Sequence, residues 1–370
     1  MKIVVLGTRG FPNVQGGVEA HCENLYPCLV KQGCDVTVIT RRPYVDLGVT
    51  SYRDVRLVAL NCPQNKFLEA FIHTFKGVLL ARKMGCDILH IHSIGPSLFV
   101  PMAKLLGLKV VMTHHGPDYE RKKWNGLAKL VLMMGEWKGC VFANEIIAIS
   151  KTIADHIKKN FGRTANQIPN GVLIPQQIGT DGALKRFGIE KGKYILTVGR
   201  FVPEKGFEDL VNAFQLGAGS NFAGYKLVVV GDADHIDKYS TKLKEKANQV
   251  KGVILTGRLT GMPLQELYTH AGLFVLPSYY EGLPIVLLEA LSYGLSCLVS
   301  DISSNREVGL DSERYFPAGD VDTMAKIIVR FLARTQALEE KDLQIKRISE
   351  KYSWEKISAE TFKVYKKICM

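Results

Sequence analysis

Short runs of continuous apolar residues alternate with amphipathic segments along most of the chain. Apolar runs of this kind are typical of strands that are buried on both faces of a parallel sheet. In the first half they predict strands at Lys2–Thr8, Asp35–Thr40, Val55–Leu60, Asp87–Ser93, Lys109–Gly116 and Glu145–Ser150. Apolar positions at helical spacing predict helices at Gly16–Gly33, Phe67–Met84, Ser97–Gly107 and Lys151–Asn160. Strands that alternate with helices indicate βαβ units and a mostly parallel sheet.

The alternation stops at Gln167–Gly179, where Pro, Asn and Gly predict a linker between two domains. It then restarts, with predicted strands at Tyr194–Arg200, Lys226–Asp232, Gly252–Leu259, Leu273–Ser278 and Ser296–Asp301. Predicted helices occupy Gly206–Gly217, Leu264–Ala271, the segment after Pro284, and Ser353–Ile368. The pattern therefore predicts an α/β fold with two doubly wound, Rossmann-like domains. Their ligands should bind at the carboxyl ends of strands, in a cleft between the facing domains.

The composition is that of a soluble globular protein: of 370 residues, 46% are apolar and 23% are charged. This length favours two domains, and the linker places them at 1–172 and 173–352. The N-terminal apolar run is short and ends in glycine, so it predicts a strand rather than a signal peptide. The sequence has no run of about 18 apolar residues, which a transmembrane helix would need. The eight cysteines have no metal-type spacing, and we expect reduced thiols in a cytoplasmic protein.

The positive charge of the chain is unevenly distributed. The formal net charge is +12, and Lys66–Arg163 contains 15 Lys and Arg against 7 Asp and Glu, which leaves +8 there. The densest pieces are Arg121–Trp124 and His156–Arg163. An ordinary solvated face explains this charge as well as a surface for anionic lipid or a phosphorylated substrate does. We expect no nucleic acid partner, because no nucleic-acid-binding motif accompanies the charge.

The segment Thr197–Gly206, TVGRFVPEKG, follows a predicted strand and precedes a predicted helix. Arg200 and Lys205 therefore lie close to a helix N-terminus, where free N–H groups and the helix dipole attract anions. Arg can hold a phosphate through two hydrogen bonds, and Lys acts as a compact charge. The segment predicts a phosphate site, although a surface loop with two solvated cations is the alternative.

The stretch Ser278–Gly294, SYYEGLPIVLLEALSYG, contains two glutamates in a largely apolar context. Pro284 suits the first turn of a helix, which puts Glu281 in the loop ahead of it and Glu289 about two turns in. A carboxylate in an apolar helix is costly unless a partner donates to it or neutralises it. The two hydroxyls of a ribose would supply two donors, so we predict a ligand diol as the partner of Glu289. A structural pair with Lys or Arg is the alternative.

Two further features have weaker chemical signals. Gly16 and Gly17, at the start of a helix, would let a ligand approach the backbone, although a tight turn explains them equally well. Four histidines, His90, His92, His114 and His115, invite a metal hypothesis. We expect no metal site there, because a histidine in an apolar strand is more often a satisfied core residue and no carboxylate or cysteine completes the cluster.

A short acidic pattern resembles the metal-binding acid pair of some sugar transferases. It occurs as Asp-Ala-Asp at Asp232–Asp234 and again as Asp-Val-Asp at Asp320–Asp322. A pattern that recurs so easily by chance is a weak basis for a metal site.

Taken in order, these motifs resemble the retaining glycosyltransferases of family 4, which have the GT-B fold. The resemblance covers nearly the whole chain. Its most specific part is Glu281-Gly-Leu-Pro followed by Glu289, and VGRFVPEKG, IPNGV, VVGD and THHG also fit. The opening GTRGFPNVQGGVE and the stretch THHGPDYERKKW are similar to a bacterial subgroup that includes rhamnosyltransferases of cell-surface polysaccharide assembly.

The resemblance implies a role for each residue of these motifs in a donor site. It implies that Arg200 and Lys205 hold the diphosphate of a nucleotide sugar, and that Glu289 binds its ribose. The predicted substrate contacts are completed by the backbone of Gly282, Leu283 and Pro284 and by Gly17.

The resemblance also implies two catalytic residues, Glu281 facing the donor sugar and His115 near it. The helix 353–370 would cross back to complete the N-terminal domain. The family needs no metal, and we expect no cofactor other than the donor itself.

The predicted activity is hexosyl transfer from a nucleotide-diphosphate sugar to a saccharide or lipid-linked acceptor in polysaccharide synthesis. Without a metal, cations and helix N-termini must stabilise the leaving diphosphate. Because no carboxylate is clearly placed as a nucleophile, front-side transfer with retention is favoured over a covalent intermediate. A lipid-linked acceptor implies peripheral binding at the inner face of the cell membrane. The alternatives are a sugar-nucleotide epimerase of the same fold and an inactive nucleotide-sugar sensor.

Overall fold

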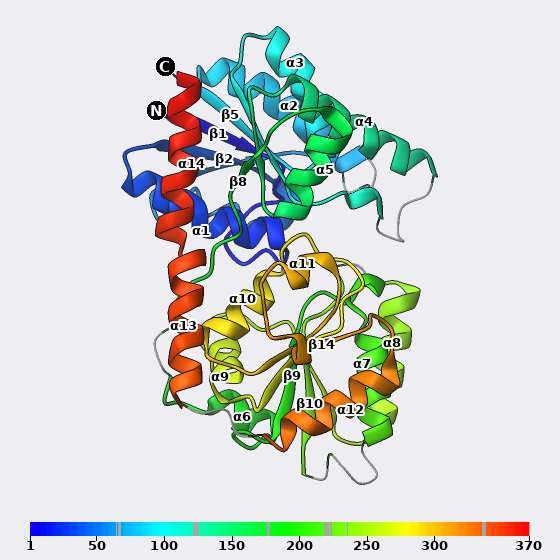
Figure 1. The fold of residues 1–370 in the computed structure, drawn as a ribbon. Helices are drawn as coiled ribbons and strands as arrows, with labels where there is room; N and C mark the ends of the chain where they lie inside the picture. Colours follow the sequence, from blue (N-terminus) through cyan, green and yellow to red (C-terminus); the bar gives the residue numbers. More distant parts are fainter. Residues whose placement is uncertain are drawn as a thin grey trace. The chain divides into compact units, whose positions relative to one another are not determined.

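The computed structural model describes residues 1–63, 65, 68–120, 126–175, 178–217, 222, 224–234, 236–334 and 338–369. The chain divides into two compact units, of which unit 1 comprises Met1–Gly171 together with Trp354–Met370. Unit 2 comprises Val172–Ser353. Each unit has a sheet that is parallel throughout or nearly so, covered by helices on both faces (Figure 1). The prediction of two doubly wound α/β units is therefore confirmed.

The sheet of unit 1 has eight strands among the described residues, in the order β3-β4-β2-β1-β5-β6-β7-β8. All neighbours are parallel except β3 and β4, which form an antiparallel pair. The strands are β1 (Lys2–Leu6), β2 (Asp35–Arg41), β3 (Ser51–Tyr52), β4 (Val55–Leu60), β5 (Ile88–His92), β6 (Val110–His114), β7 (Glu145–Ala148) and β8 (Asn166–Gln167). The central strands are buried along their whole length, as their continuous apolar sequences predict.

Helices cover both faces of the unit 1 sheet. They are α1 (Gly17–Lys31), α2 (Leu68–Met84), α3 (Val100–Leu105), α4 (Gly126–Phe142), α5 (Lys151–Phe161) and α14 (Trp354–Cys369). The C-terminal helix α14 packs beside α1, and its apolar side enters the core through Trp354, Ile357 and Tyr365. Figure 1 shows these two helices on one face of the sheet and α2–α5 on the other.

The sheet of unit 2 has six described strands, all parallel, in the order β11-β10-β9-β12-β13-β14. They are β9 (Tyr194–Val198), β10 (Lys226–Val230), β11 (Val253–Gly257), β12 (Leu273–Leu276), β13 (Cys297–Ser300) and β14 (Tyr315–Phe316). The helices are α6 (Gly182–Phe187), α7 (Phe207–Gly217), α8 (Lys238–Gln249), α9 (Met262–His270), α10 (Ile285–Ser292), α11 (Ser303–Arg306), α12 (Val321–Leu332) and α13 (Leu338–Tyr352). The apolar side of α7 and the strands β9, β10 and β12 build its core.

The α-helices of unit 1 differ from the sequence prediction in two places, and the two-residue strands β3 and β8 were not predicted. The segment Ser97–Gly107 is not one helix but a 3-10 turn, Pro96–Phe99, followed by α3. Pro101 lacks a backbone N–H, so it fits the first turn of a new helix and not the interior of a continuous one. The helix α4 was not predicted at all, because its sequence has no polar face to reveal a helical period.

Candidate active site

The predicted donor residues of unit 2 gather at the carboxyl edge of its sheet. Strand β9 lies between β10 and β12, and all three run parallel. The loops that follow them therefore emerge side by side. Arg200 and Lys205 follow β9, Glu281 follows β12, and Asp232 and Asp234 follow β10. This edge is where parallel sheets of this class bind ligands.

Two backbone contacts hold the loops after β9 and β12 together. The N–H of Tyr279 donates to the carbonyl of Glu204 at 2.8 Å. Gly206 has a φ of +65°, and a Cβ there would lie 2.3 Å from the carbonyl oxygen of Pro277. Only glycine tolerates both this conformation and this approach. The position of Lys205 relative to the β12 loop is therefore set by the backbone.

The closest pair in the site is Lys205 with Glu281. The Nζ of Lys205 lies 2.6 Å from Oε1 of Glu281, and the hydroxyl of Ser278 donates to the same oxygen at 2.6 Å. The side chains of Lys205 and Glu281 are only 15% and 10% exposed. The structure thus brings together a predicted phosphate ligand and a predicted catalytic residue, which are 76 positions apart in the sequence.

Arg200 has an acidic partner in this structure. Its guanidinium lies 3.0 Å from the carboxylate of Asp234, and Asp232 pairs with Lys244 at 2.7 Å. Both acids of the Asp-Ala-Asp pattern therefore have cationic partners. In the second acidic pattern, Asp320 caps α12 by accepting from the N–H of Thr323 at 2.9 Å. These contacts give each pattern a structural reason that needs no metal ion.

The N-terminus of α10 supplies backbone donors to the same edge. Pro284 is its N-cap residue, and no side chain caps the helix or places an acid in its first turn. Gly282 and Leu283 lead into this terminus, and the side chain of Leu283 is buried, which leaves backbone as its means of contact with a ligand. Uncapped N–H groups at a helix start are suited to an anion.

Glu289 has a partner in the protein, but the partner is neutral. The Tyr268 hydroxyl, from α9, donates to its Oε2 at 2.9 Å, and Tyr268 stacks on Tyr293. Burial raises the pKa of Glu289 to about 7, although the Tyr268 hydrogen bond acts in the opposite direction. Among the described residues no Lys or Arg forms an ion pair with it, so that alternative is not what the structure shows. Glu289 lies just over one turn into α10 rather than two.

In unit 1, the glycine predicted to lie under the diphosphate begins α1. A Cβ at Gly17 would meet nothing within 4 Å, so the space beside this backbone is open. The adjacent loop is held by an ion pair of 3.1 Å between Arg9 and Glu19. Gly17 therefore has room for a ligand, and its contact with one remains a prediction.

His115 belongs to a buried chain of hydrogen bonds. Its Nε2 lies 2.9 Å from Nδ1 of His92, and the other nitrogen of His92 contacts the hydroxyl of Tyr26. That hydroxyl also contacts His90, which bonds to Tyr365 of α14 at 2.6 Å. Burial, with smaller contributions from neighbouring histidines, holds the pKa of His115 well below its ordinary value. His115 is therefore neutral at pH 7.

The sequence did not reveal that His21, from α1, joins this group. Its Nδ1 lies 3.0 Å from Oδ1 of Asn170, and its ring packs against His92, His115 and Trp354. His21, His92 and His115 each place one nitrogen within 4.8 Å of the others, a spacing that a metal ion would accept. His92 and His115 already share a hydrogen bond between Nδ1 and Nε2, so a metal ion held by these two atoms would have to displace its proton.

His114 points into a different cluster, so the four histidines do not form one site. Its Nε2 lies 2.8 Å from Glu136, and its Nδ1 accepts from the N–H of Gly116. Glu136 also accepts from His156 at 2.9 Å and from the Tyr119 hydroxyl at 3.0 Å. Burial alone would raise the pKa of Glu136, but the hydrogen bonds from His114 and His156 lower it to about 2.

We expect activity to survive EDTA, because Asp232 and Asp234 have cationic partners and His92 and His115 are hydrogen-bonded to each other. Initial transfer rates with and without EDTA, after dialysis in metal-free buffer, check this. A loss reversed by Mg²⁺ or Mn²⁺ would contradict the expectation and point to Asp232 and Asp234. A loss reversed only by Zn²⁺ would point to the His21, His92 and His115 group.

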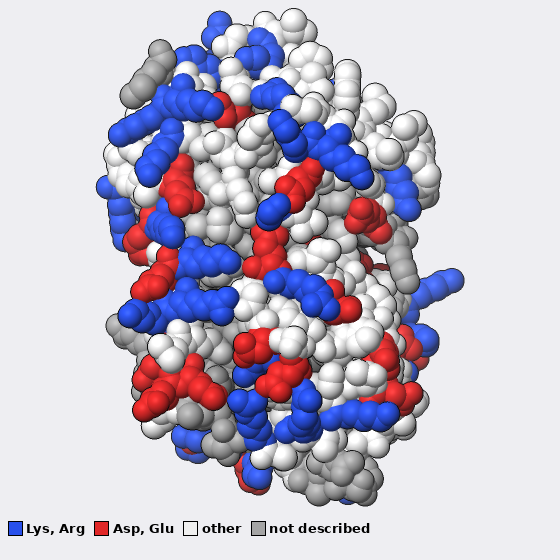
Figure 2. All heavy atoms as spheres, in the orientation of Figure 1, with Lys and Arg blue, Asp and Glu red and all other residues white. Residues whose placement is uncertain are grey.

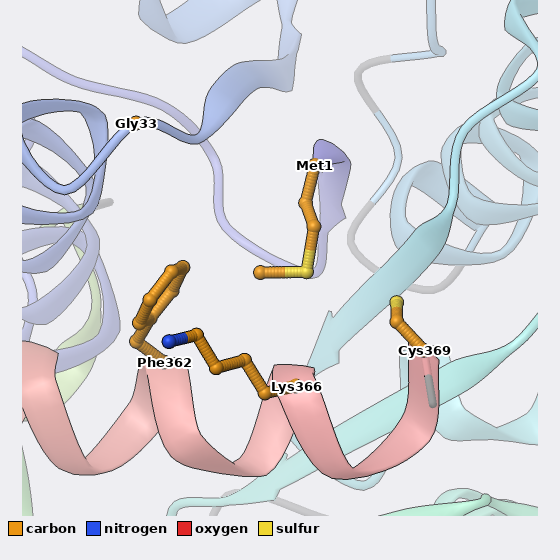
Figure 3. A pocket seen from close by; sticks show the side chains of 5 residues that line it. All are labelled: Met1, Gly33, Phe362, Lys366 and Cys369. Atoms are coloured by element: carbon orange, nitrogen blue, oxygen red, sulfur yellow. The ribbon is translucent and has the colours of Figure 1, made fainter.

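One hollow on the surface lies away from these residues. It has a volume of about 370 Å³ and is lined by Met1, Gly33, Phe362, Lys366 and Cys369 (Figure 3). Met1 precedes β1 and Gly33 precedes β2, so this hollow lies at the amino ends of the strands. That is the edge opposite the one at which such sheets bind ligands.

Comparison with known proteins gives matches along almost the whole chain. Residues 15–173 match the model described as Glycosyltransferase Family 4, and residues 183–351 match Glycosyl transferases group 1. An uncharacterized glycosyltransferase of Methanocaldococcus jannaschii is 26% identical, with 99% of this chain and 98% of that one covered. The UDP-Gal:alpha-D-GlcNAc-diphosphoundecaprenol alpha-1,3-galactosyltransferase of Escherichia coli is 27% identical over 78% of this chain and 76% of its own. The structure of Anabaena HepE with UDP-glucose has a TM-score of 0.80 at 15% identity, covering 99% of this chain and 100% of that one.

Proposed function

Because this chain belongs to the GT-B glycosyltransferases of the family 4 and group 1 type, we propose that it is a retaining, metal-independent sugar transferase. The donor would be a nucleotide-diphosphate sugar and the acceptor a saccharide. The observation that carries this proposal is the Lys205–Glu281 pair beside Arg200 at the carboxyl edge of the unit 2 sheet. This pair would set a cation for the leaving diphosphate next to a carboxylate that faces the donor sugar.

Arg200 and Lys205 would stabilise the negative charge that grows on the leaving diphosphate. Arg200 would exchange the Asp234 carboxylate for phosphate oxygens, and the N-terminus of α10 would add backbone donors. Lys205 would contact phosphate while Glu281 faces the donor sugar. The contacts that oppose charge in the transition state are those that raise the rate.

Glu289 would bind the ribose of the donor. Two ribose hydroxyls can donate to one carboxylate, and the Tyr268 hydroxyl holds that carboxylate in place from α9. His115 would act near the donor sugar as a neutral imidazole, since burial keeps its pKa low. The chain of bonds to His92 and Tyr26 would fix its ring orientation.

The acceptor would be a lipid-linked saccharide of polysaccharide synthesis at the cytoplasmic membrane face. The Escherichia coli relative is named for an undecaprenol-linked acceptor, which supports this choice. The sequence resemblance to bacterial rhamnosyltransferases supports cell-surface polysaccharide as the product. Anionic lipid would be the second partner of the enzyme.

A panel of nucleotide sugars tests the proposal. A donor at about 100 times its dissociation constant should stabilise the protein by about 2.7 kcal/mol, which a thermal shift detects. The stabilising donor is then incubated with acceptor, and NMR of the product gives the anomeric configuration, which we expect to be retained. Conversion of the donor without acceptor would indicate an epimerase. Stabilisation without any turnover would indicate a sensor.

A further inference from the structure

The outer side of α4 is apolar and exposed. Its inner side packs on the sheet and on the 3-10 turn Pro96–Phe99, where a Cβ at Gly135 would lie only 2.2 Å from the Ile94 carbonyl. A helix that is apolar on all sides is ordinarily buried. In α4, however, eight large apolar side chains are exposed: Leu127, Leu130, Val131, Met133, Met134, Trp137, Val141 and Phe142.

A second apolar stripe lies on α2. Leu68, Phe71, Phe75 and Leu79 recur at helical spacing and are all more than 40% exposed. The rings of Phe71 and Phe75 lie 4.8 and 6.1 Å from the ring of Phe99. Because the turn that carries Phe99 also packs on α4, the stripes on α2 and α4 flank the same turn. We call these exposed apolar residues, with Leu105 of α3, the α2–α4 surface.

The acidic residues of α2 and α4 are buried and do not reach the α2–α4 surface. Glu69 is the acid of α2 and Glu136 the acid of α4, and both are buried. Glu69 pairs with Arg41 at 2.9 Å, and Glu136 pairs with His114 at 2.8 Å. The exposed parts of α2, α3 and α4 therefore have no carboxylate.

Cations, by contrast, remain exposed around the α2–α4 surface. Lys76, Arg82 and Lys83 of α2 and Lys129 of α4 are exposed, and Lys138 is half-buried. In Figure 2 the edge of unit 1 over α3 and α4 is largely white, with blue side chains beside it. Every charged side chain that α2, α3 and α4 expose is therefore a cation.

We propose that the α2–α4 surface docks on an anionic lipid bilayer, with the apolar side chains of α4 inserted between headgroups. A helix in such an interface presents large apolar side chains to the acyl boundary and lysines to the headgroups. The 17 residues of α4 extend about 25 Å, enough to lie along the membrane surface. Among the described residues no helix is long and apolar enough to cross a bilayer.

A second copy of the chain is a poorer occupant than a bilayer. Self-pairing through this surface would bring its lysines and arginines against the same cations of the partner, and α2, α3 and α4 expose no carboxylate to receive them. Anionic lipid headgroups supply the missing negative charge, and the acyl region accepts the apolar side chains. Charge complementarity therefore favours an anionic membrane over a second copy of the chain as the partner of this surface.

This inference differs from an attachment by charge alone. Arg121–Trp124, the densest basic piece of the sequence, lies outside the described residues. Arg163 is engaged elsewhere, because its guanidinium donates to the carbonyls of Val141 and Ala143 at the end of α4. Lys158 and Lys159 of α5 remain exposed. Insertion of apolar side chains predicts that part of the binding persists at high salt, whereas attachment by charge alone would be lost.

The inference deepens the proposed function, since it names the surface through which the enzyme would reach a lipid-linked acceptor. Only the biological purpose of the docking surface rests on the proposed function, and vesicle binding can be tested without it.

The purified full chain is tested by co-flotation with vesicles of phosphatidylcholine alone and with added phosphatidylglycerol. We expect binding to the anionic vesicles, with at least a tenfold loss in the double variant Met134→Glu/Trp137→Glu. The matched control is Leu343→Glu on α13 of unit 2, whose side chain is 67% exposed and lies outside the surface.

Insertion has its own signature in tryptophan fluorescence. The chain has three tryptophans, and Trp354 is only 3% exposed, so a Trp124→Phe variant leaves Trp137 as the responsive one. Lipids brominated on their acyl chains should quench Trp137 in anionic vesicles. Binding that survives the double variant, or absence of quenching, overturns the proposal. If the wild type is a dimer and the double variant is a monomer, the surface is instead an interface between copies of the chain.

Donor binding separates a failure of this inference from a failure of the proposed function. Thermal stabilisation by a nucleotide sugar requires no membrane, and we expect it to be equal in wild type and the Met134→Glu/Trp137→Glu variant. Vesicle binding without donor stabilisation would leave the docking surface standing and reject the transferase. Donor stabilisation without vesicle binding would reject the docking surface and leave the transferase proposal standing.

Discussion

Replacing Lys205 with alanine should lower kcat/KM for transfer by about 10- to 150-fold. The lost contact is a charge-assisted one to a leaving diphosphate, and such contacts contribute roughly 1.5–3 kcal/mol. The variant would also leave the Glu281 carboxylate without the cation that lies 2.6 Å away, close to an incoming anion. Steady-state kinetics with the donor found by the panel gives the number.

The pairing of these two residues makes a sharper test possible. If Lys205 acts on the donor and also neutralises Glu281, the double variant Lys205→Ala/Glu281→Gln should bind the donor better than Lys205→Ala alone, while remaining slow. Lys242→Ala is the matched control, because this exposed lysine pairs with Glu208 in the same unit. Kinetics unchanged by Lys205→Ala at subsaturating donor would place the diphosphate elsewhere. Thermal unfolding of each variant shows whether the fold is kept.

The longer strands and the unit 2 loops could be predicted because their signals are local, whereas the two-residue strands β3, β8 and β14 were not predicted. Continuous apolar runs identify strands of a parallel sheet, and the positions of Arg200, Lys205 and Glu281 follow from the strands that precede them. The α4 helix was missed for a physical reason. Amphipathic periodicity exists where one side of a helix faces water, and α4 is apolar on both sides.

Contacts between segments that are far apart in the chain could not be predicted from the sequence. Nothing near Glu289 in the chain indicates that Tyr268 of α9 would donate to it. His21 meets His92 and His115 only because α1 and the strands β5 and β6 are brought together by the fold. The Asp234 partner of Arg200 likewise depends on β9 and β10 being neighbours in the sheet. The sequence located the charged residues of the loops, and the sheet order determined which of them pair.

Glu289→Gln should stabilise the unliganded protein at pH 8 while it weakens donor binding. Burial raises the pKa of Glu289 from an ordinary value of 4.5 to about 7, so the folded state holds this proton more tightly than the unfolded state does. The stabilisation from the protonated carboxyl is complete below about pH 4.5 and is lost as the pH rises through about 7. Glutamine resembles the protonated form. The variant should therefore match wild type near pH 4 and exceed it at pH 8 by up to about 3 kcal/mol.

Donor binding should show the opposite pH dependence at the same carboxylate. Ribose hydroxyls that donate to Glu289 favour its ionised form, so binding should lower its pKa and release a proton. Wild-type donor affinity should then rise by up to about tenfold between pH 6 and pH 8, and Glu289→Gln should abolish that rise and weaken binding at pH 8 by roughly tenfold or more. Calorimetry in two buffers of different ionisation enthalpy counts the released proton directly. The control is Glu245→Gln, at an exposed glutamate of α8.

Two outcomes would contradict these expectations. A donor affinity that is equal in wild type and Glu289→Gln would exclude the ribose role. An unfolding free energy that the variant leaves unchanged at both pH 4 and pH 8 would show that burial does not hold the carboxyl protonated. If both effects appear together, the same desolvation that makes Glu289 costly in the empty protein is what makes it an acceptor for a diol.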